Sequence, residues 1–147
     1  MSSTMSKYER EQFLAGVHIG IFSVAQEGRG PLTVPVWYAY EPGGEIAIWT
    51  GAESRKARLL KAAGRFTFCV QDENPPYRYV SVEGPVLSMG PASFDRDVRP
   101  LAIRYLGPEL AGPYLAGLGG DAGVANDIVI RMRPERWYSA DFSSEAI

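Results

Sequence analysis

Apolar and polar residues alternate along most of the chain, and this is the pattern of β-strands. In the segment 32–40 (LTVPVWYAY) the pattern predicts a strand with one buried face, made of Leu32, Val34, Val36, Tyr38 and Tyr40. Pro35 has no backbone N–H, so it belongs at a sheet edge or at a break in pairing. Further strands are predicted at residues 18–25, 45–50, 65–71, 77–87 and 127–132.

Helical periodicity appears in three places. A short amphipathic helix is predicted at 7–16, and the clearest helix covers 54–63, with Ser54 as its N-cap and Gly64 just past its end. The segment 93–118 is also predicted to be helical, with a kink or restart at Pro100 and a break at Gly107. Residues 119–125 are predicted to form a loop, and 133–139 simply follow the last strand.

Roughly six strands with about three helices, joined mostly in hairpin order, favour a mainly β protein. The prediction is a six-stranded antiparallel barrel in a single domain covering 1–147, because repeats and linkers are absent from the sequence. The interior of such a small barrel is filled by side chains. A sizeable ligand is therefore expected outside the barrel, for example at a subunit interface.

Composition excludes several classes of protein. Of the 147 residues, 46% are hydrophobic and the formal net charge is −2, which argues against both a disordered chain and a nucleic-acid-binding protein. No apolar run approaches the roughly 20 residues of a membrane helix and the N-terminus does not resemble a signal peptide, so we expect a cytoplasmic protein without membrane contact. Cys69 and His18 are each the only residue of their type, so no metal site is predicted. Cys69 is interpreted as a buried small hydrophobe and His18 as structural.

Four cations crowd the helix predicted at 54–63. Arg55, Lys56, Arg58 and Lys61 lie in its first two turns, where the helix dipole makes each exposed cation unfavourable by roughly 0.3–1 kcal/mol. A solvated charged face is one interpretation. The alternative is an anion site, in which free backbone N–H groups and nearby hydroxyls join the cations around a phosphate. The position at the helix start favours the anion site.

Three motifs in fixed order resemble a known superfamily. They are Pro35-Val36-Trp37-Tyr38, the segment Thr50-Gly51…Ser54-Arg55-Lys56, and Tyr79-Val80-x-Val82-x-Gly84. From about Glu11 to Tyr138 the chain resembles the pyridoxamine 5′-phosphate oxidase-like split β-barrels, also called FMN-binding split barrels. More narrowly, it is similar to the actinobacterial flavin/deazaflavin oxidoreductases that use coenzyme F420.

The resemblance implies a homodimer with two cofactor sites across its interface. It places a strand beside the cofactor ring, a strand-to-helix segment at the cofactor phosphate, a hairpin near the ring or tail, and a C-terminal segment that closes the partner's pocket. In that order, the implied cofactor-binding residues are Val34, Pro35, Val36 and Trp37; Thr50, Ser54, Arg55, Lys56 and Arg58; Gln71, Pro76 and Tyr77; and Trp137.

The sequence offers no nucleophile paired with a base, so no catalytic residue is assigned and a redox cofactor is expected to carry the reaction. The function hypothesis is an oxidoreductase that transfers a hydride from F420 to an unsaturated small-molecule substrate. Lys61 and Arg131 favour F420 over FMN, because F420 has the longer anionic tail. The alternatives are an FMN-dependent oxidoreductase on the same fold and a protein that binds a flavin, deazaflavin or tetrapyrrole without turnover.

Several aromatic residues have two interpretations. Trp37 and Trp49 are interpreted as packing residues rather than as stacking platforms for a cofactor. Trp137 fits a core position and a pocket wall equally well. Either Tyr77 or Tyr79 is expected to face the pocket, and the sequence leaves open which of the two does so.

Overall fold

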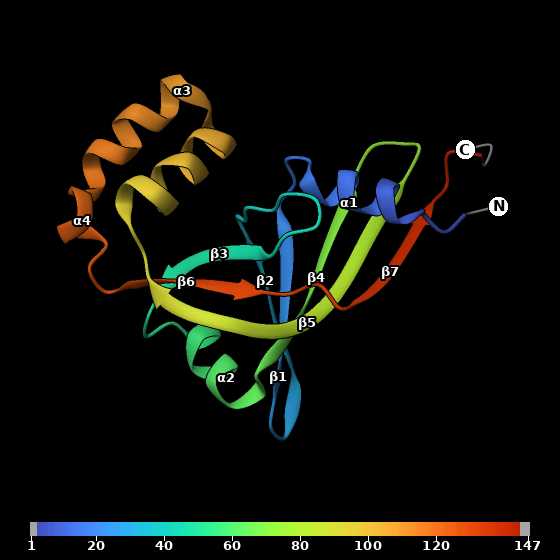
Figure 1. Ribbon diagram of the computed structural model, residues 1–147, viewed down its shortest axis with the longest axis horizontal. Helices are drawn as coiled ribbons and strands as arrows, with labels where there is room; N and C mark the ends of the chain where they lie inside the picture. Colours follow the sequence, from blue (N-terminus) through green and yellow to red (C-terminus); the bar gives the residue numbers. More distant parts are fainter. Residues whose placement is uncertain (1–2, 145–147) are drawn as a thin grey trace.

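The computed structural model describes residues 3–144 as a curled antiparallel sheet flanked by helices (Figure 1). The elements are α1 (Lys7–Ala15), β1 (Gly20–Gln26), β2 (Arg29–Val36), β3 (Ile46–Gly51), α2 (Arg55–Ala63), β4 (Arg65–Asp72), β5 (Arg78–Pro91), a π-helix η1 (Phe94–Val98), α3 (Arg99–Leu118), α4 (Gly120–Gly123), β6 (Asp127–Met132) and β7 (Arg136–Asp141). This arrangement confirms the predicted mainly β fold.

The strand order makes the sheet a split barrel. Six strands follow the order β2-β1-β4-β5-β6-β3, and β7 pairs with β5 outside this path. The two ends of the path, β2 and β3, are linked within the described residues only by an isolated bridge between Ala39 and Ala47. The long strand β5 makes the fold possible, because its first half pairs with β4 and β7 and its second half with β6.

The segment that follows β6 departs from the prediction. Residues 133–139 were expected only to trail the last strand, but 136–141 form β7, paired with β5 from Arg78↔Asp141 to Glu83↔Arg136. Its exposed Arg136 and Tyr138 weaken the apolar pattern, so the strand is specified mainly by its pairing with β5.

The core lies inside the curl of the sheet. In the segment predicted from alternation, Tyr38 and Tyr40 are buried while Thr33 and Pro35 are exposed, although β2 itself ends at Val36. The hydroxyl of Tyr38 donates to the backbone carbonyl of Leu14 over 2.5 Å and so connects this segment to the end of α1. The expected inward face is therefore confirmed.

The helices also follow the predicted signals. Ser54 caps α2, and Gly64 ends it in the left-handed conformation with φ 71°. Between β5 and β6, Pro100 lies in the first turn of α3, and Gly107 breaks that helix with φ 79°. Within the predicted loop 119–125 the structure has the four-residue helix α4 instead. No helix of the described chain is long and apolar enough to cross a membrane.

Candidate functional site

The start of α2 gathers the residues predicted to hold a phosphate, and we call Thr50, Ser54, Arg55 and Lys56 the α2 cradle. Thr50 Oγ1 donates to Ser54 Oγ over 3.2 Å, and Ser54 Oγ accepts the backbone N–H of Ala57 at the same distance. These bonds fix both hydroxyls beside the free N–H groups of the first helical turn. The structure thus brings four of the five predicted phosphate residues into one short segment.

The electrostatics of the α2 cradle fit an anion. The first turn of α2 contains no acidic residue that would complement the helix dipole. Lys56 is half-buried, and burial lowers the pKa of its ammonium below the ordinary range. Among residues 3–144 no carboxylate forms an ion pair with it. Arg55 is occupied by a neutral partner only, since its Nη2 donates to Oε1 of Gln26 over 2.9 Å. The fifth predicted residue, Arg58, is exposed on the next turn.

The predicted ring-binding strand has one unpaired edge. β2 pairs with β1 alone, so the backbone groups on its other side are not used by the sheet. Val34 and Val36 turn toward the core, and Pro35 is exposed on the opposite face. The side chains of Val34 and Val36 therefore do not contact a cofactor ring outside the barrel. The unpaired backbone N–H and C=O groups of β2 are free to form hydrogen bonds with such a ring.

The remaining predicted residues lie elsewhere. Arg55 donates a hydrogen bond to Gln26, which is the last residue of β1. Gln71 lies near the end of the neighbouring strand β4. When the pairing of β1 with β4 is continued, Gln71 is opposite Ile19, just before the first residue of β1. Seven residues of strand at about 3.3 Å each put the two ends about 23 Å apart. The exposed Pro76 and Tyr77 follow Gln71 in the β4–β5 hairpin, far from α2 (Figure 1).

The tryptophans each have a partner within the chain. Trp37 stacks on Tyr105, with ring centroids 5.0 Å apart. Trp49 Nε1 donates to Oδ2 of Asp127 over 2.9 Å. Trp137 packs against the core and carries the guanidinium of Arg10 over its ring at 4.6 Å.

The outer face of the curled sheet carries an apolar row. In register across five strands lie Pro35, Ile21, Cys69, Ser81 and Tyr138. Ile21 is 36% exposed and Tyr138 70% exposed. The interpretation of Cys69 as a buried small hydrophobe is wrong, because Cys69 is only half-buried and points to this outer face, while its strand neighbours Phe68 and Val70 point inward.

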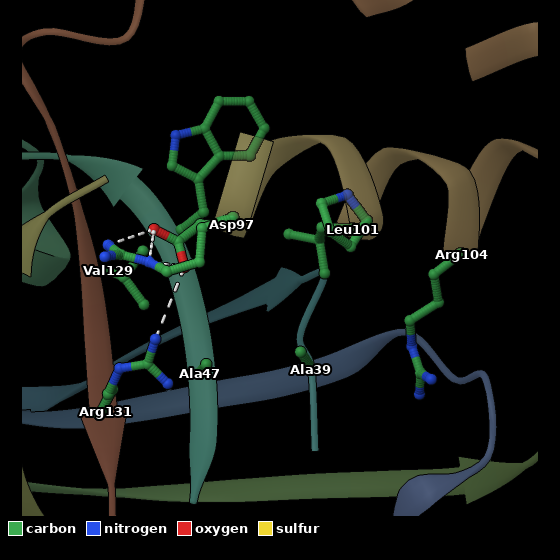
Figure 2. Close-up of a pocket in the computed structure, with 10 residues that line it drawn as sticks. Ala39, Ala47, Asp97, Leu101, Arg104, Val129 and Arg131 are labelled. Carbon is green, nitrogen blue, oxygen red and sulfur yellow. Dashed lines mark hydrogen bonds and ion pairs between the residues drawn. The ribbon is translucent and has the colours of Figure 1, made fainter. Parts of the chain in front are cut away.

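Sequence analysis missed a pocket between the outer face of β3 and β6 and the helical segment η1–α3, shown in Figure 2. We call it the β3–α3 pocket. Its volume is about 260 Å³, and it is lined by Ala39, Ala47, Trp49, Arg96, Asp97, Pro100, Leu101, Arg104, Val129 and Arg131. Only Trp49 and Arg131 carried a signal in the sequence, since pairing of distant strands and packing of α3 bring the rest together.

Comparisons with known proteins agree with this architecture. No family model and no curated protein matches the sequence. An F420 reductase structure is 25% identical, with a TM-score of 0.71 over 87% of this chain and 94% of that one. A conserved hypothetical protein from Mycobacterium tuberculosis is 26% identical, with a TM-score of 0.75 over 94% and 86%. A FAD-binding protein from Mesorhizobium loti is 18% identical, with a TM-score of 0.68 over 96% and 98%.

The fold and these likenesses define the class of protein. The chain is a split β-barrel whose terminal strands leave the barrel open between them. In fold it is similar to the pyridoxamine 5′-phosphate oxidase-like split barrels, the superfamily that its three sequence motifs resemble.

Proposed function

We propose that the chain is an oxidoreductase that binds coenzyme F420 at the interface of a homodimer and transfers a hydride to an unsaturated small molecule. One observation carries the proposal. Lys56 is half-buried at the start of a helix that has no acidic residue in its first turn, and no carboxylate of the described chain pairs with it. The N-terminus of such a helix is a binding site for anions, phosphate groups among them.

The residues present fit the phosphate of a flavin or deazaflavin. Lys56 supplies a compact positive charge, and the N–H groups of the first turn together with Thr50 and Ser54 supply hydrogen bonds. The likeness to the F420 reductase favours F420 in particular. When bound, reduced F420 supplies the hydride. The role of the protein is to hold the phosphate in register, to offer the free backbone edge of β2 to the ring, and to exclude water.

A second subunit would join the two separated groups of predicted residues. The α2 cradle and the β4–β5 hairpin lie at opposite ends of β4, so one chain cannot present both to the same ligand. The apolar outer face that carries Ile21 and Tyr138 offers a surface on which a two-fold partner can pack. In such a dimer, Gln71 and Tyr77 of one subunit would complete the site that begins at the α2 cradle of the other.

Calorimetric titration of F420 and FMN, each into separate samples, tests the proposal. We expect F420 to bind more tightly than FMN. The double variant Arg55→Ala/Lys56→Ala should lose about 2–4 kcal/mol of binding free energy, because each charged hydrogen bond contributes roughly 1.5–3 kcal/mol with some non-additivity. The control Lys7→Ala/Arg133→Ala removes the same charge from exposed positions outside the α2 cradle. Equal affinity in the wild type and the first double variant would contradict the α2 cradle as the phosphate site.

Turnover separates an enzyme from a binding protein. Reduced F420 is mixed with the protein and with conjugated acceptors, and its absorbance is followed. Loss of absorbance that depends on the protein supports hydride transfer. Tight binding of F420 without such loss, across a broad set of acceptors, would favour a non-catalytic binder.

The alternative cofactor is FMN, and one observation favours it. The α2 cradle recognises a phosphate, which FMN and F420 share, and the chain resembles a FAD-binding protein in fold. Tighter binding of FMN than of F420 would decide for an FMN-dependent oxidoreductase.

A further inference from the structure

The β3–α3 pocket is separate from the α2 cradle and shares only Arg131 with the residues considered above for the cofactor tail. Its lining is rich in charge. Three guanidinium groups, of Arg96, Arg104 and Arg131, line it with one carboxylate, that of Asp97. Burial raises the pKa of Asp97, but hydrogen bonds from Arg96 and the backbone of Ser93 outweigh this and hold it below its ordinary value, so Asp97 is ionised at neutral pH. The lining has an excess of positive charge on a protein whose formal net charge is −2.

Two of these arginines have N–H donors that form only long hydrogen bonds, or none, within the described chain. Arg131 reaches Oδ1 of Asp97 only at 3.5 Å, while Arg96 holds Oδ2 of the same carboxylate at 2.8 Å. Arg104 donates from Nη2 to the carbonyls of Ala15 and Gly16, over 3.1 and 2.7 Å. Its buried Nε has no hydrogen-bond partner, and no carboxylate within residues 3–144 forms an ion pair with it. The Arg131 side chain is 38% exposed, so its remaining donors are open to an acceptor that enters the pocket.

The remaining lining residues are apolar. The ring of Trp49 is held in place by the 2.9 Å bond from Nε1 to Asp127, and Leu101 and Val129 continue the apolar surface. Figure 2 shows the Asp97–Arg131 pair on one side of the pocket and Arg104 on the other. Trp49 lies two residues along β3 from Ala47, the register partner of Arg131, and so on the same face of the sheet. A volume of about 260 Å³ lies just below the usual range of about 300–1,000 Å³ for ligand pockets, so the pocket suits only a small molecule, with one ring at most.

We propose that the β3–α3 pocket binds a small organic carboxylate with a flat apolar body, with the guanidinium of Arg131 paired to the carboxylate and the apolar body against Trp49. The two oxygens of a carboxylate match the two parallel N–H donors of a guanidinium, and an ammonium group offers no such paired geometry. The site does not depend on the proposed F420 chemistry, because its residues are complete in one chain and separate from the α2 cradle. Binding is therefore expected in protein that carries no cofactor.

A titration of 15N-labelled, cofactor-free protein with trans-cinnamate, followed by NMR, tests this site. We expect saturable shifts centred on Trp49, Val129 and Arg131, and at least fivefold weaker binding of the neutral analogue cinnamamide. Arg131→Gln should raise the Kd for cinnamate by about tenfold, the loss expected for one charged hydrogen bond. The matched control Arg133→Gln removes the same charge from an exposed position outside the pocket and should leave the Kd unchanged.

A second variant tests the site independently, in case Arg131→Gln fails to fold. Ala47 lines the pocket from β3, and Ala47→Phe should fill the cavity and abolish binding while the rest of the spectrum is retained. Wild-type protein without saturable shifts at 10 mM cinnamate would overturn the proposal, as would a Kd that neither variant changes. A last titration uses inorganic phosphate in place of cinnamate. If it moved the same resonances with the same affinity, the pocket would be a simple anion site and the claim for an apolar carboxylate would be wrong.

Discussion

Trp37 lies flat against Tyr105, with ring centroids 5.0 Å apart and ring planes 2° apart. The hydroxyl of Tyr105 donates to the carbonyl of His18 over 2.7 Å and accepts the N–H of Tyr38 over 3.1 Å. One side chain of α3 therefore contacts the chain just before β1 and the chain just after β2. This contact positions α3 over the barrel, and with it the whole roof of the β3–α3 pocket.

The hydroxyl of Tyr105 is expected to contribute measurably to stability. Tyr105→Phe keeps the stacked ring but leaves the N–H of Tyr38 and the carbonyl of His18 without their partner, so the free energy of unfolding should fall by about 1–3 kcal/mol. Tyr114→Phe is the matched control, because Tyr114 contacts Trp37 by its ring edge and its hydroxyl makes no hydrogen bond within the described chain. Urea unfolding measures both variants. Equal stabilities would show that the hydroxyl of Tyr105 does not hold α3 in place.

Gly84 is required where β5 passes from one half of the sheet to the other. A Cβ at this position would overlap the carbonyl oxygen of Arg133, which belongs to the backbone and cannot rotate away. Gly84→Ala should therefore lower the free energy of unfolding by about 1–3 kcal/mol or prevent folding. Gly90→Ala lies on the same strand with open space around its Cβ, and it should change stability by well under 1 kcal/mol. Thermal unfolding of the pair checks the prediction, and a tolerated Gly84→Ala would contradict it.

Helices and strands could be predicted from the sequence where residues close together in the chain specify them. Ser54 and Gly64 mark the ends of α2, and alternation marks the inward face of β4, because both signals act between residues close in sequence. β7 was missed because its exposed residues blur the alternation and its place depends on β5, more than fifty residues earlier. Cys69 was misplaced for a related reason. Its apolar neighbours suggested the core, but strand geometry turns adjacent side chains to opposite faces.

The two candidate sites also differ in how far they could be predicted from the sequence. The α2 cradle is contiguous, so its cations and hydroxyls could be recognised from the sequence. The β3–α3 pocket is assembled from β3, η1, α3 and β6, and within the sequence Arg96 and Arg104 looked like ordinary helix residues. Arg104 becomes notable only through the burial of its Nε, which no sequence pattern reports.

The apolar outer face of the sheet is expected to be the dimer interface of the proposed enzyme. Ile21 lies in the middle of this face, between Pro35 and Cys69, so Ile21→Glu would bury a charge in any interface formed there. We expect this variant to sediment as a monomer and to lose cofactor affinity, because each site needs both subunits. Leu110→Glu places the same charge at an exposed position on α3 and should leave the dimer intact. Dimeric Ile21→Glu would place the interface elsewhere.

Binding of the cofactor phosphate is expected to weaken at alkaline pH through Lys56. Burial lowers the pKa of Lys56, so in the free protein its ammonium loses its proton below the usual value of about 10.4. For folding, the same shift means that stability rises slightly as pH increases through this pKa, because the buried charge is then removed. For binding the sign is opposite, because the phosphate needs the charged form.

The affinity should therefore be constant from about pH 8, where a phosphate monoester with a second pKa of about 6 is fully ionised, and should fall as Lys56 deprotonates. In Lys56→Arg the guanidinium keeps its charge throughout this range, so its affinity should stay level where that of the wild type falls. Fluorescence titrations with FMN and F420 between pH 8 and pH 10.5 measure both profiles. Superimposable profiles would mean that Lys56 does not contact the phosphate, and the anion would then have to be held by Arg55 and the helix N–H groups alone.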